Sequence, residues 1–201
     1  MNWDDHASEW DDDPAVRTYA AAAFERLRSE IPRLEGLRVL DFGCGTGLLT
    51  EALAATSPFL VALDPSQKMI DVVERKKAKH GWQNVRPCSA TLDTALVSNP
   101  ELFSQGFDLI VCSSVCAFVP DYPATVHALA SLLAPGGLFV QFDWELDESA
   151  EEPYGLSRAG IQGALEQAGL SRIVVETAFE RPMGEMTMAP LLGAGRRATA
   201  P

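Results

Sequence analysis

The sequence predicts an α/β protein in which helices cover both faces of a doubly wound, mostly parallel sheet of seven strands whose last strand is antiparallel. Short apolar runs rich in β-branched residues alternate along the chain with longer segments of helical periodicity. Several of these runs are apolar throughout, which is typical of strands buried on both faces of a parallel sheet. Repeated strand–helix units produce right-handed crossovers and therefore a three-layer α/β/α arrangement.

Six apolar runs are predicted to be strands, and a seventh near the end of the chain is predicted to return antiparallel. The six runs are residues 37–42, 59–64, 84–89, 107–114, 138–144 and 171–179. The antiparallel strand is expected within residues 184–197. Helices are expected where a capping residue or a first-turn proline precedes a helical pattern. They are predicted to begin at Asp13 and at Asp64 and to cover residues 121–134 and 157–168.

Length and composition predict a single domain over residues 1–201, with 47% hydrophobic residues to form its core. Residues 1–13 are expected to form an acidic N-terminal flap, and residues 198–201 a C-terminal tail. The four cysteines form no CxxC pair, and no apolar run approaches the length of a membrane span. The acidic start does not resemble a secretory signal. We therefore expect reduced thiols, no membrane partner and a cytoplasmic location.

The charge balance disfavours nucleic acid as a partner. Sixteen basic residues face twenty-eight acidic ones, which gives a net charge of −12 that would repel a phosphate backbone. The one basic cluster, residues 74–80, has the spacing of a solvated helix face. A small molecule is the expected partner, and the chain is expected to be a monomer or a homodimer.

The segment VLDFGCGTGLLT, residues 39–50, places glycines at positions 43, 45 and 47 directly after the first predicted strand. Parallel sheets bind ligands beyond the carboxyl ends of their strands, and glycine lets the backbone approach a ligand. Leu48 stands where a dinucleotide-binding GxGxxG motif requires glycine, and no lysine follows as in a P-loop. The pattern therefore favours a nucleoside-like cofactor without phosphates. Asp64 ends the second strand, where it either accepts hydrogen bonds from a ribose or caps the next helix.

Four motifs together resemble class I S-adenosylmethionine-dependent methyltransferases. They are VLDFGCGTG at residues 39–47, LDPSQKMI at 63–70, FDLIVCSSVCAFVPD at 107–121 and LLAPGGLFVQFDW at 132–144. The resemblance covers nearly the whole chain and implies a Rossmann-like fold. It also implies S-adenosyl-L-methionine as cofactor and methyl transfer to a small-molecule acceptor by in-line displacement.

The resemblance implies a role for each residue of the cofactor site. The backbone of Gly43, Cys44 and Gly45, with Asp41 nearby, would receive the methionine end, Ser113 would face that end, and Asp64 would bind the ribose. Pro65 and Met69 would flank the adenine, although Met69 is equally typical of a core position. The family often has an acid near the adenine amino group. This chain has Ser89 there, so the contact would come from Ser89 or the Ala90 amide.

The acceptor side is expected to come from short segments around the cofactor mouth. Trp10, together with Trp3 and Tyr19, is predicted to close over the cofactor as a lid. The alternative is an acidic tail whose tryptophans rest on the surface. Cys116 lies in the loop after the fourth strand, which is expected to contact the acceptor. Residues 143–145, with Trp144 foremost, form either a substrate wall or an ordinary turn.

No catalytic residue and no metal site are predicted. The three histidines, at positions 6, 80 and 127, have the patterns of surface or packing residues. The cysteines would need to converge in space to hold a metal. Two other functions remain open: a sensor that binds the cofactor or its demethylated product without catalysis, and a nucleotide-dependent oxidoreductase, which Leu48 disfavours.

Overall fold

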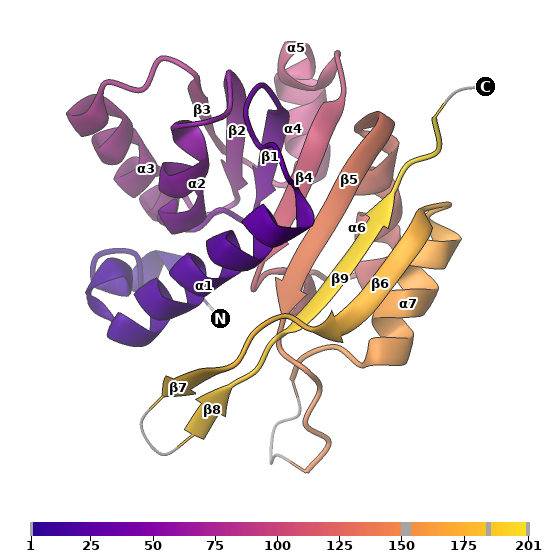
Figure 1. Cartoon of the computed structure of the whole chain (residues 1–201). Coiled ribbons are helices and arrows are strands. Elements are labelled where there is room, and N and C mark those ends of the chain that lie inside the picture. Colours follow the sequence, from indigo (N-terminus) through magenta and orange to yellow (C-terminus); the bar gives the residue numbers. More distant parts are fainter. Residues whose placement is uncertain (1, 150–153, 184–185, 200–201) are drawn as a thin grey trace.

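The computed structural model of the chain describes residues 2–149, 154–183 and 186–199, and its centre is a seven-stranded sheet (Figure 1). The strand order is β3-β2-β1-β4-β5-β9-β6, and β9 is antiparallel to both of its neighbours. The predicted seven strands with an antiparallel last strand are thus confirmed. The strands are β1 (Arg38–Phe42), β2 (Phe59–Asp64), β3 (Val85–Ser89), β4 (Phe107–Ser113), β5 (Leu133–Asp143), β6 (Ser171–Thr177) and β9 (Leu191–Arg196).

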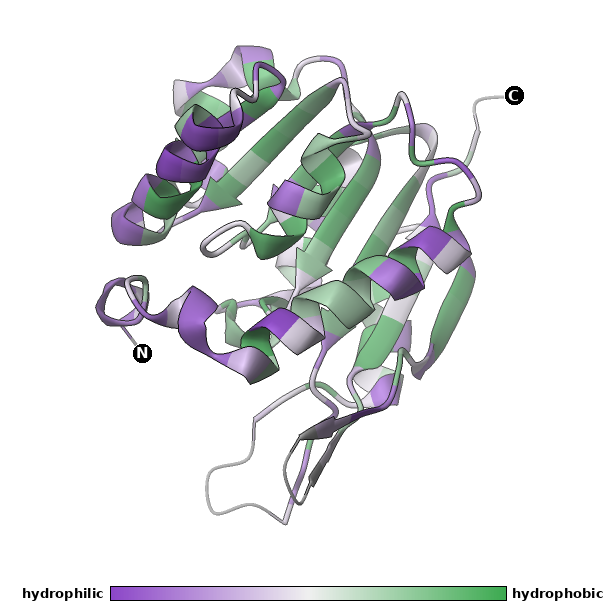
Figure 2. Ribbon diagram, turned by 60° about the vertical axis from the view of Figure 1, so that its left-hand side comes forward, coloured by the Kyte–Doolittle hydropathy of each residue, from purple (hydrophilic) through white to green (hydrophobic). Residues whose placement is uncertain are grey.

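Helices cover both faces of this sheet, which confirms the three-layer prediction. One layer consists of α1 (Pro14–Glu30), α2 (Leu48–Ala54) and α3 (Gln67–His80). The other consists of α4 (Leu92–Ser98), α5 (Pro100–Phe103), α6 (Tyr122–Ser131) and α7 (Arg158–Gln167). Because side chains alternate along a strand, Val39 packs in the first layer and Leu40 in the second. Figure 2 shows the resulting apolar sheet beneath helices with polar outer faces.

Three parts of the chain differ from the sequence-based expectation. The helices α4 and α5 were not predicted, because each is short and the pair is interrupted before Pro100. The strand expected over residues 184–197 is divided by Pro190 into β8 (Met186–Met188) and β9, and β8 pairs with β7 (Arg181–Met183) as a separate hairpin. The helix expected to reach residue 134 ends at Ser131, and residues 133–137 extend β5 instead.

The sheet topology creates one crevice at the carboxyl ends of the parallel strands. β1 pairs with β2 on one side and with β4 on the other, so the connections that leave these strands separate at this point. Figure 1 shows the N-terminal segment and the β7-β8 hairpin at the same end of the sheet. Of the described helices, none combines the length and the apolar character that crossing a membrane requires.

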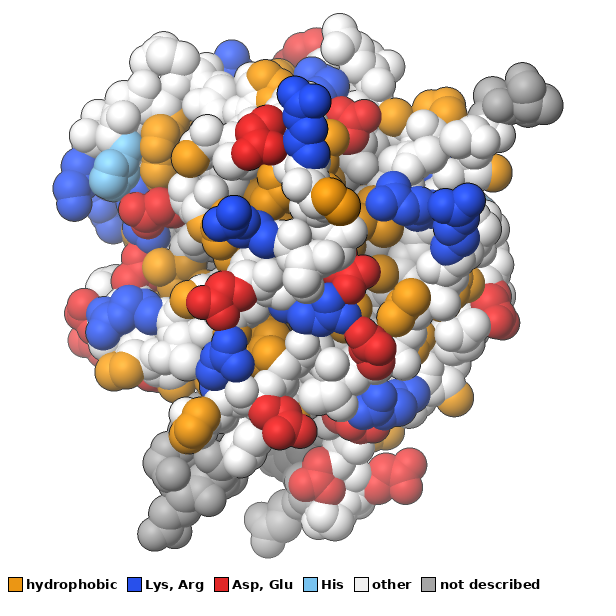
Figure 3. Space-filling view, in the orientation of Figure 1, with side chains coloured by type: hydrophobic (Ala, Val, Ile, Leu, Met, Phe, Trp, Pro, Cys, Tyr) orange, Lys and Arg blue, Asp and Glu red, His pale blue; other side chains and the backbone are white. Residues whose placement is uncertain are grey.

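Charged side chains of both signs are interspersed over the face of the molecule drawn in Figure 3. On that face Lys and Arg do not gather into a single patch, and acidic side chains lie between them. Some charged side chains of the protein form ion pairs between segments distant in sequence. Arg26 pairs with Glu176, and Arg181 pairs with Glu25. Acidic side chains on this face are therefore mixed with basic ones, and two carboxylates of the chain are neutralised by arginines from distant segments.

Candidate functional site

A cavity of about 670 Å³ opens at the carboxyl ends of β1, β2 and β4. Its volume is within the range of small-molecule sites, and most of its wall is apolar. Of the residues predicted to bind cofactor, all but Ser89 lie on its wall: Asp41, Gly43, Cys44, Gly45, Asp64, Pro65, Met69, Ala90 and Ser113. Segments far apart in sequence therefore converge on one site.

The turn after β1 has a left-handed backbone at each of its glycines, with φ values of +69° at Gly43, +54° at Gly45 and +81° at Gly47. Side chains other than glycine rarely adopt this conformation. A Cβ at Gly43 would lie 2.3 Å from the Val115 side chain, whereas a Cβ at Gly45 would meet no atom within 4 Å. The close approach at Gly43 is therefore to this chain's own Val115, and the open side at Gly45 borders the cavity.

Asp64 connects the end of β2 to this glycine turn. Its carboxylate accepts hydrogen bonds from the amides of Gly45 (3.0 Å) and Ser66 (2.8 Å). The cap of α3 is Ser66, whose hydroxyl accepts from the Met69 amide, so the alternative role of Asp64 as the cap of that helix is wrong. Burial raises the pKa of Asp64, while the two backbone hydrogen bonds partly oppose the shift. Each carboxylate oxygen retains capacity to accept a further hydrogen bond from a ligand.

Asp41 places a second carboxyl group on the cavity wall, and it is 1% exposed. One oxygen accepts a hydrogen bond from the Thr50 hydroxyl at 2.6 Å, and the other has no partner among the described residues. Burial raises the pKa of Asp41 to about 7. A buried carboxylate oxygen without a partner is costly, and a cationic ligand group at this wall would remove that cost.

The far end of the cavity is apolar and is formed by Pro65, Met69 and the start of α4. Met69 is 2% exposed, as expected of a core residue, and it also lines the cavity. Ser89 is exposed and lies outside the cavity lining, because the strand alternation directs the preceding Cys88 into the core. The Ala90 amide donates to the Asp64 carbonyl at 3.1 Å, so it is already paired. The expected adenine contact through either group is not supported.

The opposite end of the cavity is aromatic. Tyr19, Trp144 and Tyr154 line it and come from three separate segments, while Phe118 lines the cavity against Trp3 of the N-terminal flap, with their rings 5.2 Å apart. The Tyr19 and Trp144 rings are 5.4 Å apart, and the Tyr19 hydroxyl donates to the Phe142 carbonyl at 3.0 Å. Residues 150–153 of the neighbouring loop, which was expected to contact the acceptor, lie outside the described residues.

Three residues expected near the acceptor do not reach the cavity. Cys116 is the first residue of η3 (Cys116–Phe118). It is 1% exposed and packs in the core beside Cys112. Asp143 is fully buried and accepts from the Ala117 amide at 3.2 Å. Glu145 pairs with Arg158 on the surface at 2.8 Å. Of residues 143–145, Trp144 alone lines the cavity, because alternation along the end of β5 directs its neighbours elsewhere.

The N-terminal flap crosses the cavity mouth. Trp3 in η1 (Trp3–Asp5) and Trp10 in η2 (Trp10–Asp12) both line the cavity, with their rings 5.8 Å apart. Asp4 accepts from the Ser66 hydroxyl, and Asp11 accepts from the Thr46 hydroxyl and pairs with Lys76 at 2.8 Å. Asp4 and Asp11 therefore attach the flap to the turn after β1, to the turn after β2 and to α3.

The described residues offer no metal site, and none of the three histidines lines the cavity. His80 stacks on Trp82, while His6 lies among the flap tryptophans. The four cysteines are free thiols. Cys112 and Cys116 lie side by side in the core. Burial raises the pKa of the Cys112 thiol, while the hydrogen bond with Cys112 and, after it, burial raise the pKa of the Cys116 thiol.

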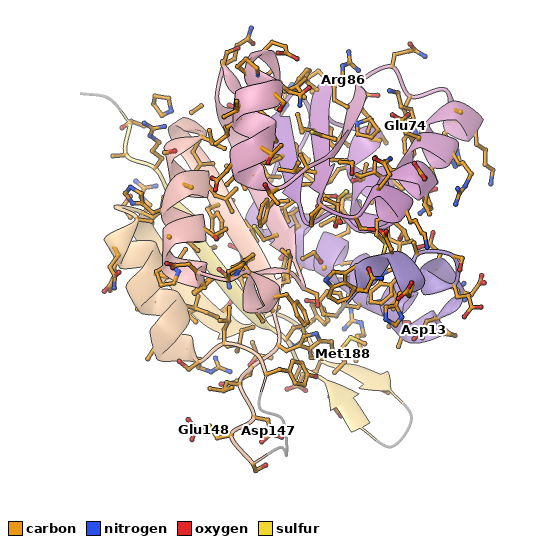
Figure 4. All side chains as sticks on the ribbon, turned by 180° about the vertical axis from the view of Figure 1, so that it is seen from behind. Asp13, Glu74, Arg86, Asp147, Glu148 and Met188 are labelled. Atoms are coloured by element: carbon orange, nitrogen blue, oxygen red, sulfur yellow. The ribbon has the colours of Figure 1, made fainter. Side chains whose placement is uncertain are left out.

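Some cavity residues were not identified from sequence, among them Ser114, Phe118 and Met188. The loop after β4 was expected to contact the acceptor, but which of its residues turn inward depends on the backbone at Ser114. Met188 of β8 reaches the cavity only through the hairpin (Figure 4). Asp147 and Glu148 lie on the loop beyond this end of the sheet (Figure 4).

The fold and the site define a class of α/β enzymes, the class I S-adenosylmethionine-dependent methyltransferases, and the resemblance found in the sequence is confirmed. A family model described as a methyltransferase domain matches residues 16–182, and the chain belongs to this family.

Curated relatives of the chain are also named methyltransferases. The chain is 36% identical over 126 residues to a ubiquinone biosynthesis O-methyltransferase of Caulobacter sp. (strain K31), covering 62% of this chain and 48% of the relative. It is 37% identical over 108 residues to an uncharacterised methyltransferase of Schizosaccharomyces pombe, covering 52% of this chain and 38% of the relative. The chain thus spans about half the length, or less, of these two relatives.

Solved structures share the fold over most of the chain. DhpI, in a complex titled DhpI-SAM-HEP, superposes with a TM-score of 0.68 at 25% identity over 97% of this chain and 94% of DhpI. Magnesium protoporphyrin IX methyltransferase (ChlM) of Synechocystis PCC 6803 with bound SAM superposes with a TM-score of 0.68 at 20% identity, covering 90% of this chain and 79% of ChlM. The predicted fold class is confirmed.

Proposed function

We propose that this chain binds S-adenosylmethionine in the cavity, one molecule per chain, and transfers its methyl group to a small-molecule acceptor. The observation that carries the proposal is the placement of two buried carboxyl groups, Asp41 and Asp64, on either side of the turn at Gly45. One has an oxygen without a partner, which suits the cationic methionine end, and the other ends β2, which suits the ribose. Relatives in complexes with SAM support the choice of cofactor.

The remaining cofactor contacts follow from this orientation. The backbone of Gly43, Cys44 and Gly45 would receive the methionine end, and Ser113 would lie beside it at the end of β4. Pro65 and Met69 would enclose the adenine between a pyrrolidine ring and a polarizable thioether. With the Ala90 amide already paired, the adenine would be bound through shape and apolar contact more than through that amide.

When bound, S-adenosylmethionine supplies an electrophilic methyl carbon on a sulfonium. The protein's contribution is to align the acceptor with that carbon and to exclude water. Tyr19, Phe118 and Trp144 provide an apolar wall for this purpose. Trp3 and Trp10 of the N-terminal flap would close the remaining side, so we propose that the flap is a lid that opens for cofactor exchange.

The acceptor that fits this wall is a small molecule with an apolar body. The described wall of the acceptor end consists of aromatic and aliphatic side chains with the hydroxyls of Ser113 and Ser114 among them. Curated relatives named O-methyltransferases support oxygen as the accepting atom.

Calorimetry tests the binding half of the proposal. Titration with S-adenosylmethionine and with S-adenosylhomocysteine should each give a saturable isotherm of one molecule per chain, and both should raise the melting temperature. NAD should do neither. Absence of a saturable site for both sulfur compounds would refute the proposal, and protection by NAD alone would favour an oxidoreductase.

Transfer of a labelled methyl group distinguishes an enzyme from a sensor. Incubation with methyl-labelled S-adenosylmethionine and pooled metabolites should yield labelled small molecules and S-adenosylhomocysteine. Tight binding without any transfer would favour the sensor.

A further inference from the structure

Ser114 has a strained backbone at the acceptor end of the cavity. Its φ of +55° lies in the left-handed region, which a serine adopts only when its surroundings impose it. The Ser114 amide donates to the Phe142 carbonyl at 2.7 Å, which fixes the residue against the end of β5. Ser114 lines the cavity, so the strained conformation presents its side chain there. Backbone strain of this kind is a reason to look for a function in the side chain.

Trp144 donates a hydrogen bond to the Ser114 hydroxyl and so holds its oxygen in place. The Trp144 Nε1 lies 3.1 Å from the Ser114 Oγ, and an indole nitrogen is only a donor. Ser114 is therefore the acceptor in this bond, and its own hydroxyl proton remains available. Among the described residues no group accepts that proton.

Ser114 and Trp144 are both held by further contacts. Trp144 packs against the Tyr19 ring at 5.4 Å, and the Tyr19 hydroxyl donates to the same Phe142 carbonyl that accepts from the Ser114 amide. The three residues come from α1, the end of β4 and the end of β5, and all three line the cavity. A ligand at this wall would meet a hydroxyl oxygen that is held in place before binding and whose proton can rotate toward the ligand.

We propose that Ser114 donates a hydrogen bond to the oxygen of a hydroxylated aromatic acceptor, with Trp144 as the positioning residue behind it. The proposal rests on the methyltransferase function proposed above. The rings of Tyr19 and Trp144, 5.4 Å apart on the cavity wall, suit a planar aromatic body. A hydrogen bond donated to a phenolate favours the ionised form, and the bond from Trp144 strengthens it through the chain of donors.

The reaction step is balanced without a further reactant. The phenol releases its proton to water, and the phenolate oxygen is held by the Ser114 hydroxyl. A lone pair of that oxygen forms the new O–C bond while the C–S bond breaks. The electron pair of the broken bond goes to sulfur, so the sulfonium becomes the neutral thioether of S-adenosylhomocysteine.

Two phenols of different acidity test the proposal with methyl-labelled S-adenosylmethionine. Para-cresol is almost wholly protonated near neutral pH, whereas a large fraction of para-nitrophenol is already ionised. In Ser114→Ala, kcat/KM for para-cresol should fall about tenfold or more, because the variant lacks a hydrogen bond to a charged oxygen. For para-nitrophenol, whose hydroxyl is more acidic in solution, kcat/KM should fall about threefold or less. The pH profile for para-cresol should shift to higher pH.

Matched variants separate the hydroxyl from the backbone. Ser114→Gly also lacks the hydroxyl but relieves the positive φ, so it should fold at least as stably and show the same kinetic loss. Trp144→Phe keeps an aromatic ring without the N–H and should lose a smaller part of the para-cresol rate. S-adenosylhomocysteine affinity, measured by calorimetry, should be unchanged in Ser114→Ala.

The outcomes distinguish this inference from the proposed function. Equal losses for the two phenols, or full para-cresol activity in Ser114→Gly, would overturn the role of Ser114. If the wild-type protein binds S-adenosylhomocysteine but methylates neither phenol, the aromatic acceptor class is wrong while cofactor binding stands. If it binds no cofactor, the proposed function itself fails.

Discussion

The amide of Gly45 donates a hydrogen bond to the Asp64 carboxylate across 3.0 Å, which joins the turn after β1 to the end of β2. The two residues are 19 positions apart, with the whole of α2 between them. Neighbouring parallel strands bring their carboxyl ends together, so the pair forms as a consequence of the β1-β2 register. The same carboxylate therefore shapes the glycine turn and faces the cavity.

Replacement of Asp64 by alanine should weaken S-adenosylmethionine binding by about 1.5 to 3 kcal/mol, or about tenfold to hundredfold. The physical reason is the loss of a charged hydrogen-bond acceptor at the proposed ribose position. Calorimetry measures the change. Asp93→Ala, which removes an exposed carboxylate on α4, is the matched control and should bind as the wild-type protein does. Equal affinities in folded Asp64→Ala and wild type would refute the ribose role.

The free energy of unfolding should carry a pH dependence from Asp41. Because burial raises its pKa to about 7, the folded state holds a proton that the unfolded chain has already released. The contribution of Asp41 to stability is therefore greatest at low pH and declines as the pH rises from about 4 to about 7. Urea denaturation across this range should show a shallower decline in Asp41→Asn. An identical pH dependence in both proteins would show that Asp41 does not titrate as inferred.

Affinity for S-adenosylmethionine should rise with pH, whereas the contribution of Asp41 to stability declines. Ionised Asp41 attracts the cationic methionine end, so S-adenosylmethionine should bind about fivefold more tightly, or better, at about pH 7 than at about pH 5. In Asp41→Asn this rise should disappear, because an amide does not ionise in this range. Isothermal titration of both proteins at the two pH values is the measurement. A pH-dependent gain that survives in Asp41→Asn would assign the effect to another group.

Deletion of residues 1–12 should weaken cofactor binding about tenfold or more and speed cofactor release, because Trp3 and Trp10 would no longer cover the cavity. Asp11→Ala should give a smaller effect of the same sign, since it removes the contacts with Thr46 and Lys76 only. Asp12→Ala changes an exposed neighbour and serves as the control. Stopped-flow fluorescence follows release. A truncated protein that binds and transfers like the full chain would show that the flap is not a lid.

Substitution of Gly43 by alanine should lower the free energy of unfolding by about 2 to 4 kcal/mol. About 1 to 2 kcal/mol comes from the positive φ, and the rest comes from overlap of the new Cβ with Val115. The Val115 Cβ itself would lie 2.6 Å from the new Cβ, so adding Val115→Gly should recover the overlap part and leave the backbone part. Urea denaturation of Gly43→Ala, of the double variant and of Val115→Gly alone completes the cycle. The absence of any rescue would mean that Val115 does not restrict this position.

The order of the elements could be predicted because each carries a local signal. Continuous apolar runs gave the strands, and Asp13 with Pro14 marked the start of α1, where the Asp13 carboxylate accepts from the Ala15 amide. The short helices α4 and α5 and the division of the last strand at Pro190 lack a strong periodic pattern, and they were not predicted. Their form depends on packing against the rest of the sheet.

The candidate cofactor site could also be predicted in large part, since Gly43, Gly45 and Asp64 follow strands whose ends must meet in a parallel sheet. Ser89 and Cys116 were expected to face the cavity and do not line it. A shift of one residue along a strand or a turn moves a side chain to the opposite side.

The sequence by itself thus determined the class of fold, the family and the glycine–carboxylate pattern, because these depend on local chemistry and on the rule that parallel strands end together. Only the tertiary structure decided that Trp144 donates to Ser114, that Val115 occupies the space beside Gly43, and that the acidic flap is attached across the cavity. Such contacts join residues far apart in the chain. They exist only when every backbone direction between those residues has been set, and a local pattern does not contain that information.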